Sequence, residues 1–178
     1  MKQKIARIFR VTGIIFFVDL LRYRYMWLKN RKKNKQFLVE NPGIALPGPY
    51  MIYETFRLDY QRYYEKGRET AEWVKEEVSP FMELASRDIL DWGCGPGRVV
   101  RHLPEVIGKG CRFYGSDYNA AYINWCSSHI PAVTFSKNDL NPPLPYGDKH
   151  LISFMFFPYS PTFRSVATGS GLMSYTAC

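Results

Sequence analysis

The sequence has few of the residues that build metal sites and disulfide frameworks. Its four cysteines, at positions 94, 111, 126 and 178, show no C-x-x-C spacing, and its three histidines are not spaced as metal ligands. We therefore expect no metal site and no disulfide scaffold, and this cysteine usage fits a reducing, cytoplasmic location. The 178 residues, 46% of them hydrophobic and 22% charged, have the composition of a globular domain with a real core.

Acidic residues are scarce at the N-terminus. Residues 1–36 contain eleven Lys and Arg but only one acid, Asp19, and so carry a net charge of +10. The remaining residues contain 13 basic and 15 acidic side chains and carry −2, which together gives the +8 of the whole chain. Because the basic character is confined to one segment, a nucleic-acid-binding face across the domain is not favoured.

A hydrophobic run long enough to cross a membrane is also missing from this basic segment. Its longest uncharged stretch is residues 11–18, whereas a transmembrane helix needs ~20 residues. No small-residue cleavage site of a signal peptide follows this stretch. Apolar residues three and four apart nevertheless predict a helix through about Leu28, with one apolar face. That face comprises Ile8, Val11, Ile15, Val18, Leu21, Tyr25 and Leu28.

The N-terminal helix has two interpretations that the sequence leaves open. It can lie on an anionic membrane surface, with Lys and Arg among the headgroups, so that residues 1–36 make a peripheral membrane contact. It can instead pack on its own domain or on a partner, followed by a solvated basic run. A Pro- and Gly-rich linker then covers residues 37–52.

A second helix is predicted over residues 55–81. In it Tyr63, Ala71, Val74 and Val78 can share one face, and Ser79-Pro80 ends the helix. The chain therefore divides into four predicted parts. These are a basic amphipathic helical extension (1–36), the linker (37–52), an α/β half (53–149) and an atypical tail (150–178).

Strand and helix signals alternate after this helix. The apolar run DILDW predicts a strand, GCGPG is a glycine-dense turn, and RVVRHLPEV opens a helix. CRFYGSDY, NAAYINWCSSHI and AVTFSKNDL then predict a second strand, a second helix and a third strand. This β-α-β-α-β order predicts the first half of a doubly wound parallel sheet, whose ligands bind at the carboxyl ends of the strands.

The turn lies at one such strand end and suits the approach of a ligand. Gly93 and Gly95 can adopt backbone angles closed to other residues and leave the main chain accessible. Gly97 is expected to let the following helix pack close to the strand. Asp117, 20 residues later at the end of the second strand, can accept hydrogen bonds from both hydroxyls of a ribose.

The end of the third strand adds residues that can bind the base of an adenosine. Asn138 and Asp139 can bind the exocyclic amine of an adenine, and Tyr118 can stack on its ring. The glycine spacing is G-x-G-x-G with Arg98 next, not the G-x-G-x-x-G that places a pyrophosphate on a helix N-terminus. A carboxylate at Asp91, two residues before the first glycine, repels a pyrophosphate and suits a cofactor that carries an ammonium group.

At these residues the chain resembles the class I S-adenosylmethionine-dependent methyltransferases. The resemblance runs from about Tyr53 to Asp148 and rests on ILDWGCGPGR, FYGSDYNAAYINWC and VTFSKNDLNPPLPYGD. It implies an α/β, Rossmann-like doubly wound sheet, incomplete at about three to four of seven strands. It also implies S-adenosyl-L-methionine as the cofactor and methyl transfer to an unidentified acceptor, expected to be a small molecule. No catalytic residue or general base is identified.

The resemblance also implies which residues hold the cofactor. The methionine moiety is expected to be bound by Asp91, Gly93, Cys94, Gly95 and Gly97. The ribose is expected to be bound by Asp117 and Tyr118, and the adenine by Asn138, Asp139 and Leu140. Within the turn, Cys94 is expected to fill a small space rather than to act as a nucleophile. The helix that contains YYEKGRETAEW resembles the one that precedes the first strand in bacterial members. From it Arg68 is expected to reach the cofactor carboxylate.

The tail departs from the family pattern. LISFMFF can form a buried fourth strand, but the residues after it read as loop, so the tail offers about one strand where four strands and three helices are expected. A two-base shift of the reading frame at about His150 can restore a fourth strand and an amphipathic helix. We therefore interpret the tail as a frameshift product, in which case the chain is an inactive N-terminal fragment.

Two other functions stay open. One is a nicotinamide-dependent oxidoreductase of the Rossmann class, against which Arg98 and Asp91 argue. The other is a non-catalytic fragment that binds a membrane or a partner through residues 1–36.

Overall fold

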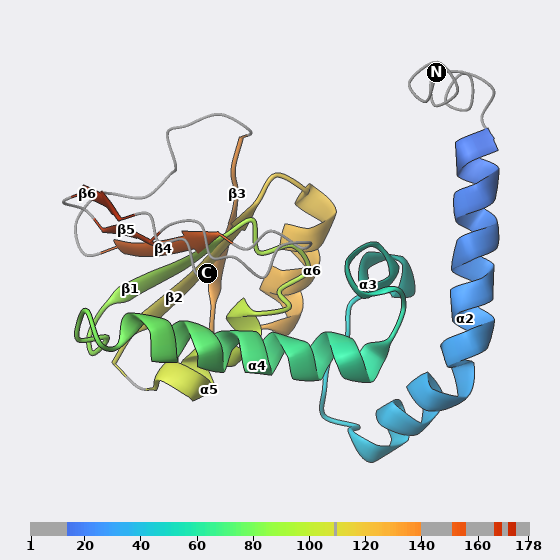
Figure 1. The fold of residues 1–178 in the computed structure, drawn as a ribbon, viewed down its shortest axis with the longest axis horizontal. Coiled ribbons are helices and arrows are strands. Elements are labelled where there is room, and N and C mark those ends of the chain that lie inside the picture. Colours follow the sequence, from blue (N-terminus) through green and yellow to red (C-terminus); the bar gives the residue numbers. More distant parts are fainter. Residues whose placement is uncertain (1–13, 109, 140–150, 156–165, 169–170, 174–178) are drawn as a thin grey trace. The chain divides into compact units, whose positions relative to one another are not determined.

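The computed structural model describes residues 14–108, 110–139, 151–155, 166–168 and 171–173 (Figure 1). The chain divides into two compact units, Met1–Tyr63 and Tyr64–Cys178. The division lies inside a helix, ten residues after the predicted start of the α/β half at Tyr53.

The first unit is helical. Helix α2 (Ile14–Glu40) is followed by α3 (Pro49–Phe56) and by the first turn of α4 (Tyr60–Val78). Four buried residues of this unit form a core cluster: Ile52, Tyr53, Leu58 and Tyr63. Helix α2 extends twelve residues beyond the predicted end at Leu28, because tertiary contacts hold its second half. The Asn34 side chain donates to the Leu58 carbonyl at 2.9 Å, and Phe37 is buried.

The single helix predicted over residues 55–81 is wrong in one respect, since the structure has a break between α3 and α4. Arg57 and Leu58 adopt left-handed backbone angles, with φ of 52° and 59°, and the Leu58 side chain is fully buried. Asp59 then caps α4 by accepting the backbone N–H of Arg62 at 3.0 Å. The break follows from the left-handed conformation of Arg57, which ends α3 as its C-cap and donates its backbone N–H to the Tyr53 carbonyl. The predicted helix end before Ser79 is confirmed.

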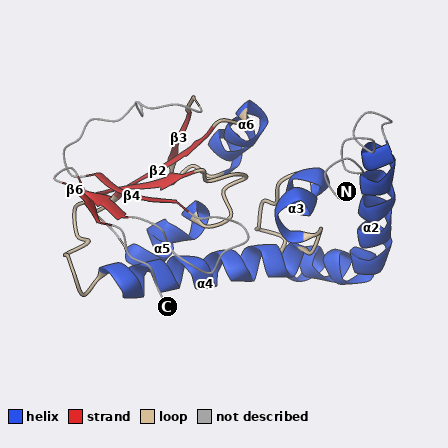
Figure 2. Cartoon of the chain, turned by 45° about the horizontal axis from the view of Figure 1, so that its top comes forward, coloured by secondary structure: helices blue, strands red, loops and turns tan. Residues whose placement is uncertain are grey.

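The second unit contains a sheet, drawn in red in Figure 2. Its strand order is β3-β2-β1-β4-β5-β6, with the strands labelled in Figure 1. Its parallel strands are β1 (Asp88–Trp92), β2 (Arg112–Asp117), β3 (Thr134–Lys137) and β4 (Leu151–Met155). Short strands β5 (Val166–Thr168) and β6 (Gly171–Met173) are antiparallel. Strand β3 pairs with β2, whereas β4 pairs with β1 on the other side of the β1–β2 pair. The direction in which strands are added to the sheet therefore reverses between β3 and β4. This confirms the predicted α/β Rossmann-like sheet and the fourth strand within LISFMFF.

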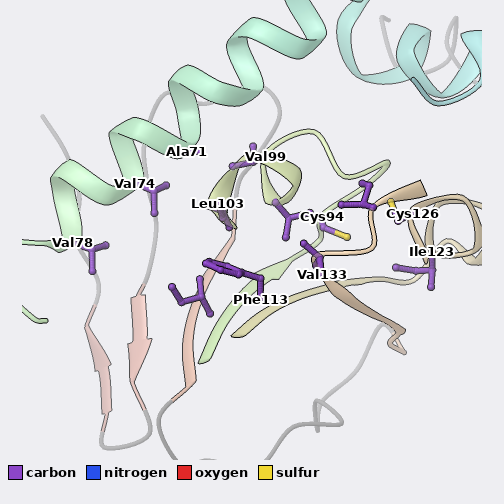
Figure 3. Close-up of a cluster of buried hydrophobic side chains, with 13 residues drawn as sticks. Ala71, Val74, Val78, Cys94, Val99, Leu103, Phe113, Ile123, Cys126 and Val133 are labelled. Carbon is purple, nitrogen blue, oxygen red and sulfur yellow. The ribbon is translucent and has the colours of Figure 1, made fainter. Parts of the chain in front are cut away.

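The helices of this unit pack on one face of the sheet. They are α4, the 3₁₀ turn η1 (Val100–His102), α5 (Leu103–Ile107) and α6 (Ala120–His129). Ile89 and Phe113 are register partners and share a core cluster with residues of these helices. Ala71, Val74 and Val78 of α4 lie in this cluster, as the predicted helical face requires (Figure 3).

The helix after the glycine turn is shorter than its sequence suggests. It begins as a 3₁₀ turn at Val100 and ends at Ile107, because Gly108 adopts a φ of 108°. Leu140 lies outside the described residues, and the frameshift interpretation of the tail stays a prediction. In the described part of the chain, no helix combines the length and the hydrophobicity needed to cross a membrane.

Candidate functional site

Three buried polar residues lie at the carboxyl ends of three neighbouring strands. Asp91 is the next-to-last residue of β1, Asp117 is the last residue of β2, and Asn138 directly follows β3. The Asn138 backbone N–H donates to the Asp117 carbonyl at 3.1 Å. Because β1, β2 and β3 are adjacent and parallel, the sheet brings these residues to one edge.

The glycine turn is tied to the end of β2. The backbone N–H groups of Gly93 and Cys94 both donate to the Ser116 carbonyl, at 2.7 and 3.0 Å. The Gly95 N–H donates to Asp117 Oδ2 at 2.9 Å. Gly93 and Gly95 have φ of +76° and +54°, and a Cβ added at either would meet nothing within 4 Å. The turn is therefore held on one side and open on the other, where a ligand can approach its backbone.

Asp91 has the most unusual environment among these residues. Its carboxylate accepts a hydrogen bond from the backbone N–H of Val100, and its Oδ1 is buried without a hydrogen-bond partner. The pKa of Asp91 is raised to about 7, chiefly by burial and also by the charge of Asp117, while Arg98 and the Val100 N–H oppose the shift. Asp91 thus presents a buried acceptor that a cationic donor would satisfy.

Asp117 and Asn138 differ in how many acceptor atoms they have left. Asp117 Oδ1 accepts the Asn119 N–H at 2.8 Å while Oδ2 accepts Gly95, but each carboxylate oxygen has a further lone pair for a hydroxyl. Asn138 donates through Nδ2 to the Asp139 carbonyl at 2.7 Å, and its Oδ1 is buried without a partner. Asn138 Oδ1 is therefore a second unsatisfied acceptor at this edge.

Tyr118 and Asp139 flank this edge on the solvent side. The Tyr118 side chain is 60% exposed directly after β2, and Asp139 is also exposed. A ring in this position is accessible to a stacking partner.

The structure places Arg68 and Arg98 differently from what the sequence suggests: Arg68 forms surface ion pairs, whereas Arg98 acts on the site. The Arg68 guanidinium pairs with Glu72 at 3.1 Å and with Glu105 at 2.8 Å, both on the exposed surface. Its contact with a cofactor carboxylate stays a prediction. Arg98 received no role from the sequence, yet it donates to the Lys66 carbonyl at 3.1 Å and acts electrostatically on Asp91.

Cys94 and Gly97 have packing roles in the turn. The Cys94 thiol is buried near Gly115, and burial raises its pKa well above the usual value, so it is not poised as a nucleophile. A Cβ on Gly97 would lie 2.6 Å from Ile130 Cδ1 and 3.1 Å from Cys126 Sγ. The close approach that Gly97 permits is therefore to α6, and not between β1 and the helix after the turn.

Gly67 of α4 is a positioning residue that the sequence analysis did not identify. A Cβ at this position would lie 2.2 Å from the carbonyl oxygen of Arg98. Glycine therefore lets α4 contact the backbone of the glycine turn directly. The signal that could have found it is an isolated glycine inside a helical pattern, which costs helix stability unless close packing requires it.

Four of the turn's backbone N–H groups, which a pyrophosphate would need as donors, are already used within the protein. The N–H groups of Gly93, Cys94, Gly95 and Gly97 all donate to protein oxygens, and Pro96 has none. The Val100 N–H, at the start of the following helix, is engaged by Asp91. A carboxylate thus occupies the position where a dinucleotide site holds its phosphates.

No family model matches this chain, and no curated protein matches it. Solved structures similar to it include a SAM-dependent methyltransferase from Aquifex aeolicus, at 22% identity and a TM-score of 0.45, covering 62% of this chain and 57% of that one. Another is magnesium protoporphyrin IX methyltransferase from Synechocystis PCC 6803 with bound SAH, at 19% identity and a TM-score of 0.39, covering 86% and 57%. A third is a TehB-like SAM-dependent methyltransferase from Corynebacterium glutamicum, at 17% identity and a TM-score of 0.33, covering 50% and 54%. The chain spans about half the length of these structures.

Proposed function

We propose that this chain binds S-adenosyl-L-methionine at the edge formed by Asp91, Asp117 and Asn138, as the cofactor-binding part of a methyltransferase. The observation that carries the proposal is the buried Asp91 carboxylate, whose Oδ1 has no donor. A buried acceptor left unpaired costs about 1–3 kcal/mol, and a bound ammonium group would recover that cost.

The two unsatisfied acceptors match the two ends of this cofactor. Asp91 Oδ1 suits the ammonium group of its methionine moiety, and Asn138 Oδ1 suits the exocyclic amine of its adenine. Between them, Asp117 has lone pairs for the ribose hydroxyls, and exposed Tyr118 can cover the adenine ring. The open side of Gly93 and Gly95 leaves room for the moiety that joins the two ends.

The chemistry follows from the cofactor rather than from an acid or base of this chain. When bound, S-adenosylmethionine supplies a methyl group on a sulfonium, which an aligned acceptor takes up. The named residues would bind and orient the cofactor, and we assign no catalytic residue. A nicotinamide dinucleotide is disfavoured, because the N–H groups of the four turn residues named above and that of Val100 are already engaged.

The proposal is tested by calorimetric titration of the full chain with S-adenosylmethionine at pH 7.5. Asp91→Asn keeps the shape of the side chain but removes its negative charge. We expect about 10- to 100-fold weaker binding, since a hydrogen bond to a charged group contributes about 1.5–3 kcal/mol.

The matched control is Asp88→Asn, which makes the same change at the opposite end of β1. Asp88 pairs with Arg112 and lies away from the turn, so its substitution is expected to leave the affinity within about twofold. Equal binding by Asp91→Asn and the wild type would contradict the assignment of the ammonium site.

A further inference from the structure

Helix α2 packs in the first unit through one row of side chains. Tyr53 Oη donates to Asp19 Oδ1 at 2.6 Å, and Tyr23 and Met26 pack on the cluster of Ile52, Tyr53, Leu58 and Tyr63. Further along, Asn30 and Asn34 both donate to the Leu58 carbonyl, at 3.1 and 2.9 Å. We call Asp19, Tyr23, Met26, Asn30 and Asn34 the inward row, and its spacings of three and four define one face of the helix.

A second row on a different face of α2 is exposed, and we call it the outward row. Its members, also three and four apart, are Phe17, Leu21, Arg24, Leu28, Arg31 and Lys35. Large apolar side chains dominate the start of this face: Phe17 is 61% exposed, Leu21 52% and Leu28 65%. The apolar face that the sequence predicts, through Leu21 and Leu28, is therefore the exposed face and not the one that packs on α3.

The charged side chains of α2 are almost all positive, and most of them lie C-terminal to the apolar residues of the outward row. The helix has seven Lys and Arg against the two acids Asp19 and Glu40. Asp19 belongs to the inward row, so the outward row carries cations alone. The Arg31 guanidinium lies over the exposed Trp27 ring at 5.4 Å from its centroid, so an aromatic ring lies beside a cation of the outward row.

We propose that α2 docks through its outward row onto an anionic phospholipid surface, lying in the plane of the interface. Exposed Phe, Leu and Trp side chains suit the boundary between headgroups and acyl chains, and the Lys and Arg residues suit anionic headgroups. A phosphate backbone of a nucleic acid would satisfy the cations but not the apolar side chains. Docking of a second copy of the outward row would bring Arg24, Arg31 and Lys35 against like charges.

The test uses the full chain in sedimentation with phosphatidylcholine vesicles, with and without phosphatidylserine. We expect binding to the mixed vesicles, at least about 10-fold weaker binding to the neutral ones, and loss of binding on raising the salt concentration. Phe17→Ser/Leu21→Ser/Leu28→Ser and Arg31→Glu/Lys35→Glu are each expected to lower binding at least about 10-fold. All these residues are exposed, so unchanged circular dichroism is expected to show that the variants fold.

Two controls make the same chemical changes elsewhere. Phe81→Ser alters an apolar residue that is 63% exposed in the turn after α4, and Arg62→Glu/Lys137→Glu reverses two exposed charges outside α2. Both are expected to bind vesicles like the wild type. Equal binding to neutral and anionic vesicles, no binding to either, or equal losses in the controls would overturn the proposal. Self-association through α2 in sedimentation velocity without lipid, with no vesicle binding, would overturn it in favour of a second copy.

Discussion

At the scale of single residues, Asp91 stands out because its environment favours the neutral carboxylic acid. The side chain is almost completely buried, and the charge of Asp117 adds to the effect of burial. Arg98, held by the Lys66 carbonyl and the Thr70 hydroxyl, limits the shift. The pKa of Asp91 therefore lies near 7, and a cationic ligand would stabilise its ionised form.

The raised pKa predicts how stability depends on pH. Between about pH 4 and pH 7 the folded protein retains a proton on Asp91 that the unfolded chain releases, so rising pH lowers the free energy of unfolding. Asp91→Asn cannot titrate, and its stability relative to the wild type is expected to rise over this range by up to about 4 kcal/mol. Urea denaturation of both proteins at several pH values measures the difference.

The stability of the wild type must be compared with that of Asp91→Asn because His102 also titrates in this range. The effect of His102 on the pH dependence of stability has the opposite sign to that of Asp91. Burial lowers the pKa of His102 to about 4, so the unfolded chain binds a proton there that the folded chain does not, and stability rises with pH from about 4 to 6.5. The histidine is present in both proteins and cancels in the difference. A difference between them that is flat from pH 4 to 7 would show that Asp91 is not buried as described.

The residues at the strand ends could be predicted because their spacing reflects local chemistry. Asp91, Asp117 and Asn138 each end or follow a strand, and parallel strands bring such positions together. The partners of Arg68 and Arg98 could not be predicted, because they depend on how α4 and α5 pack. Arg68 has Glu105 within reach only because residues 37 positions apart meet in the fold.

At the scale of elements, the contact between α4 and the glycine turn positions the site. Gly67 allows this contact, and Arg98, the residue it meets, also hydrogen-bonds to the backbone of Lys66. Both interactions hold the turn that contains Gly95, which in turn donates to Asp117. A shift of α4 is therefore expected to reach the cofactor site.

Gly67→Ala tests this packing. The added Cβ would lie 2.2 Å from the Arg98 carbonyl oxygen, and we expect a net loss of at least about 1 kcal/mol of unfolding free energy even though alanine favours the helix by about 1 kcal/mol. Urea denaturation measures this loss. Gly43→Ala, where a Cβ meets nothing within 4 Å, is the control and is expected to change stability by less than about 1 kcal/mol. Gly67→Ala at wild-type stability would mean that α4 does not approach the turn closely.

The kinds of element followed from sequence patterns more closely than their boundaries did. Strand β1 and the end of α4 carry strong local signals, and both agree with the structure. The break at Arg57–Leu58 and the extension of α2 to Glu40 depend on contacts between distant segments, such as Asn34 with Leu58. Local periodicity does not contain that information.

At the scale of the whole molecule, the two units differ in the chemistry that they present. The second unit brings three strand ends to one edge with two unsatisfied acceptors. The first unit exposes an apolar and cationic face on α2. We propose that the second unit holds the cofactor and that the first contacts a membrane surface, and the experiments for the two are independent.

The central claim, that the strand-end site is built for S-adenosylmethionine and not for a dinucleotide, is tested most directly by calorimetry of the full chain with each ligand. We expect saturable binding of S-adenosylmethionine and of S-adenosylhomocysteine, which keeps the ammonium group and the adenosine. No binding of NAD is expected at the same concentrations, because the N–H groups of Gly93, Cys94, Gly95 and Gly97 are already engaged and the Asp91 carboxylate would repel its phosphates. NAD binding as tight as that of S-adenosylmethionine, or a folded sample that binds neither, would contradict the claim.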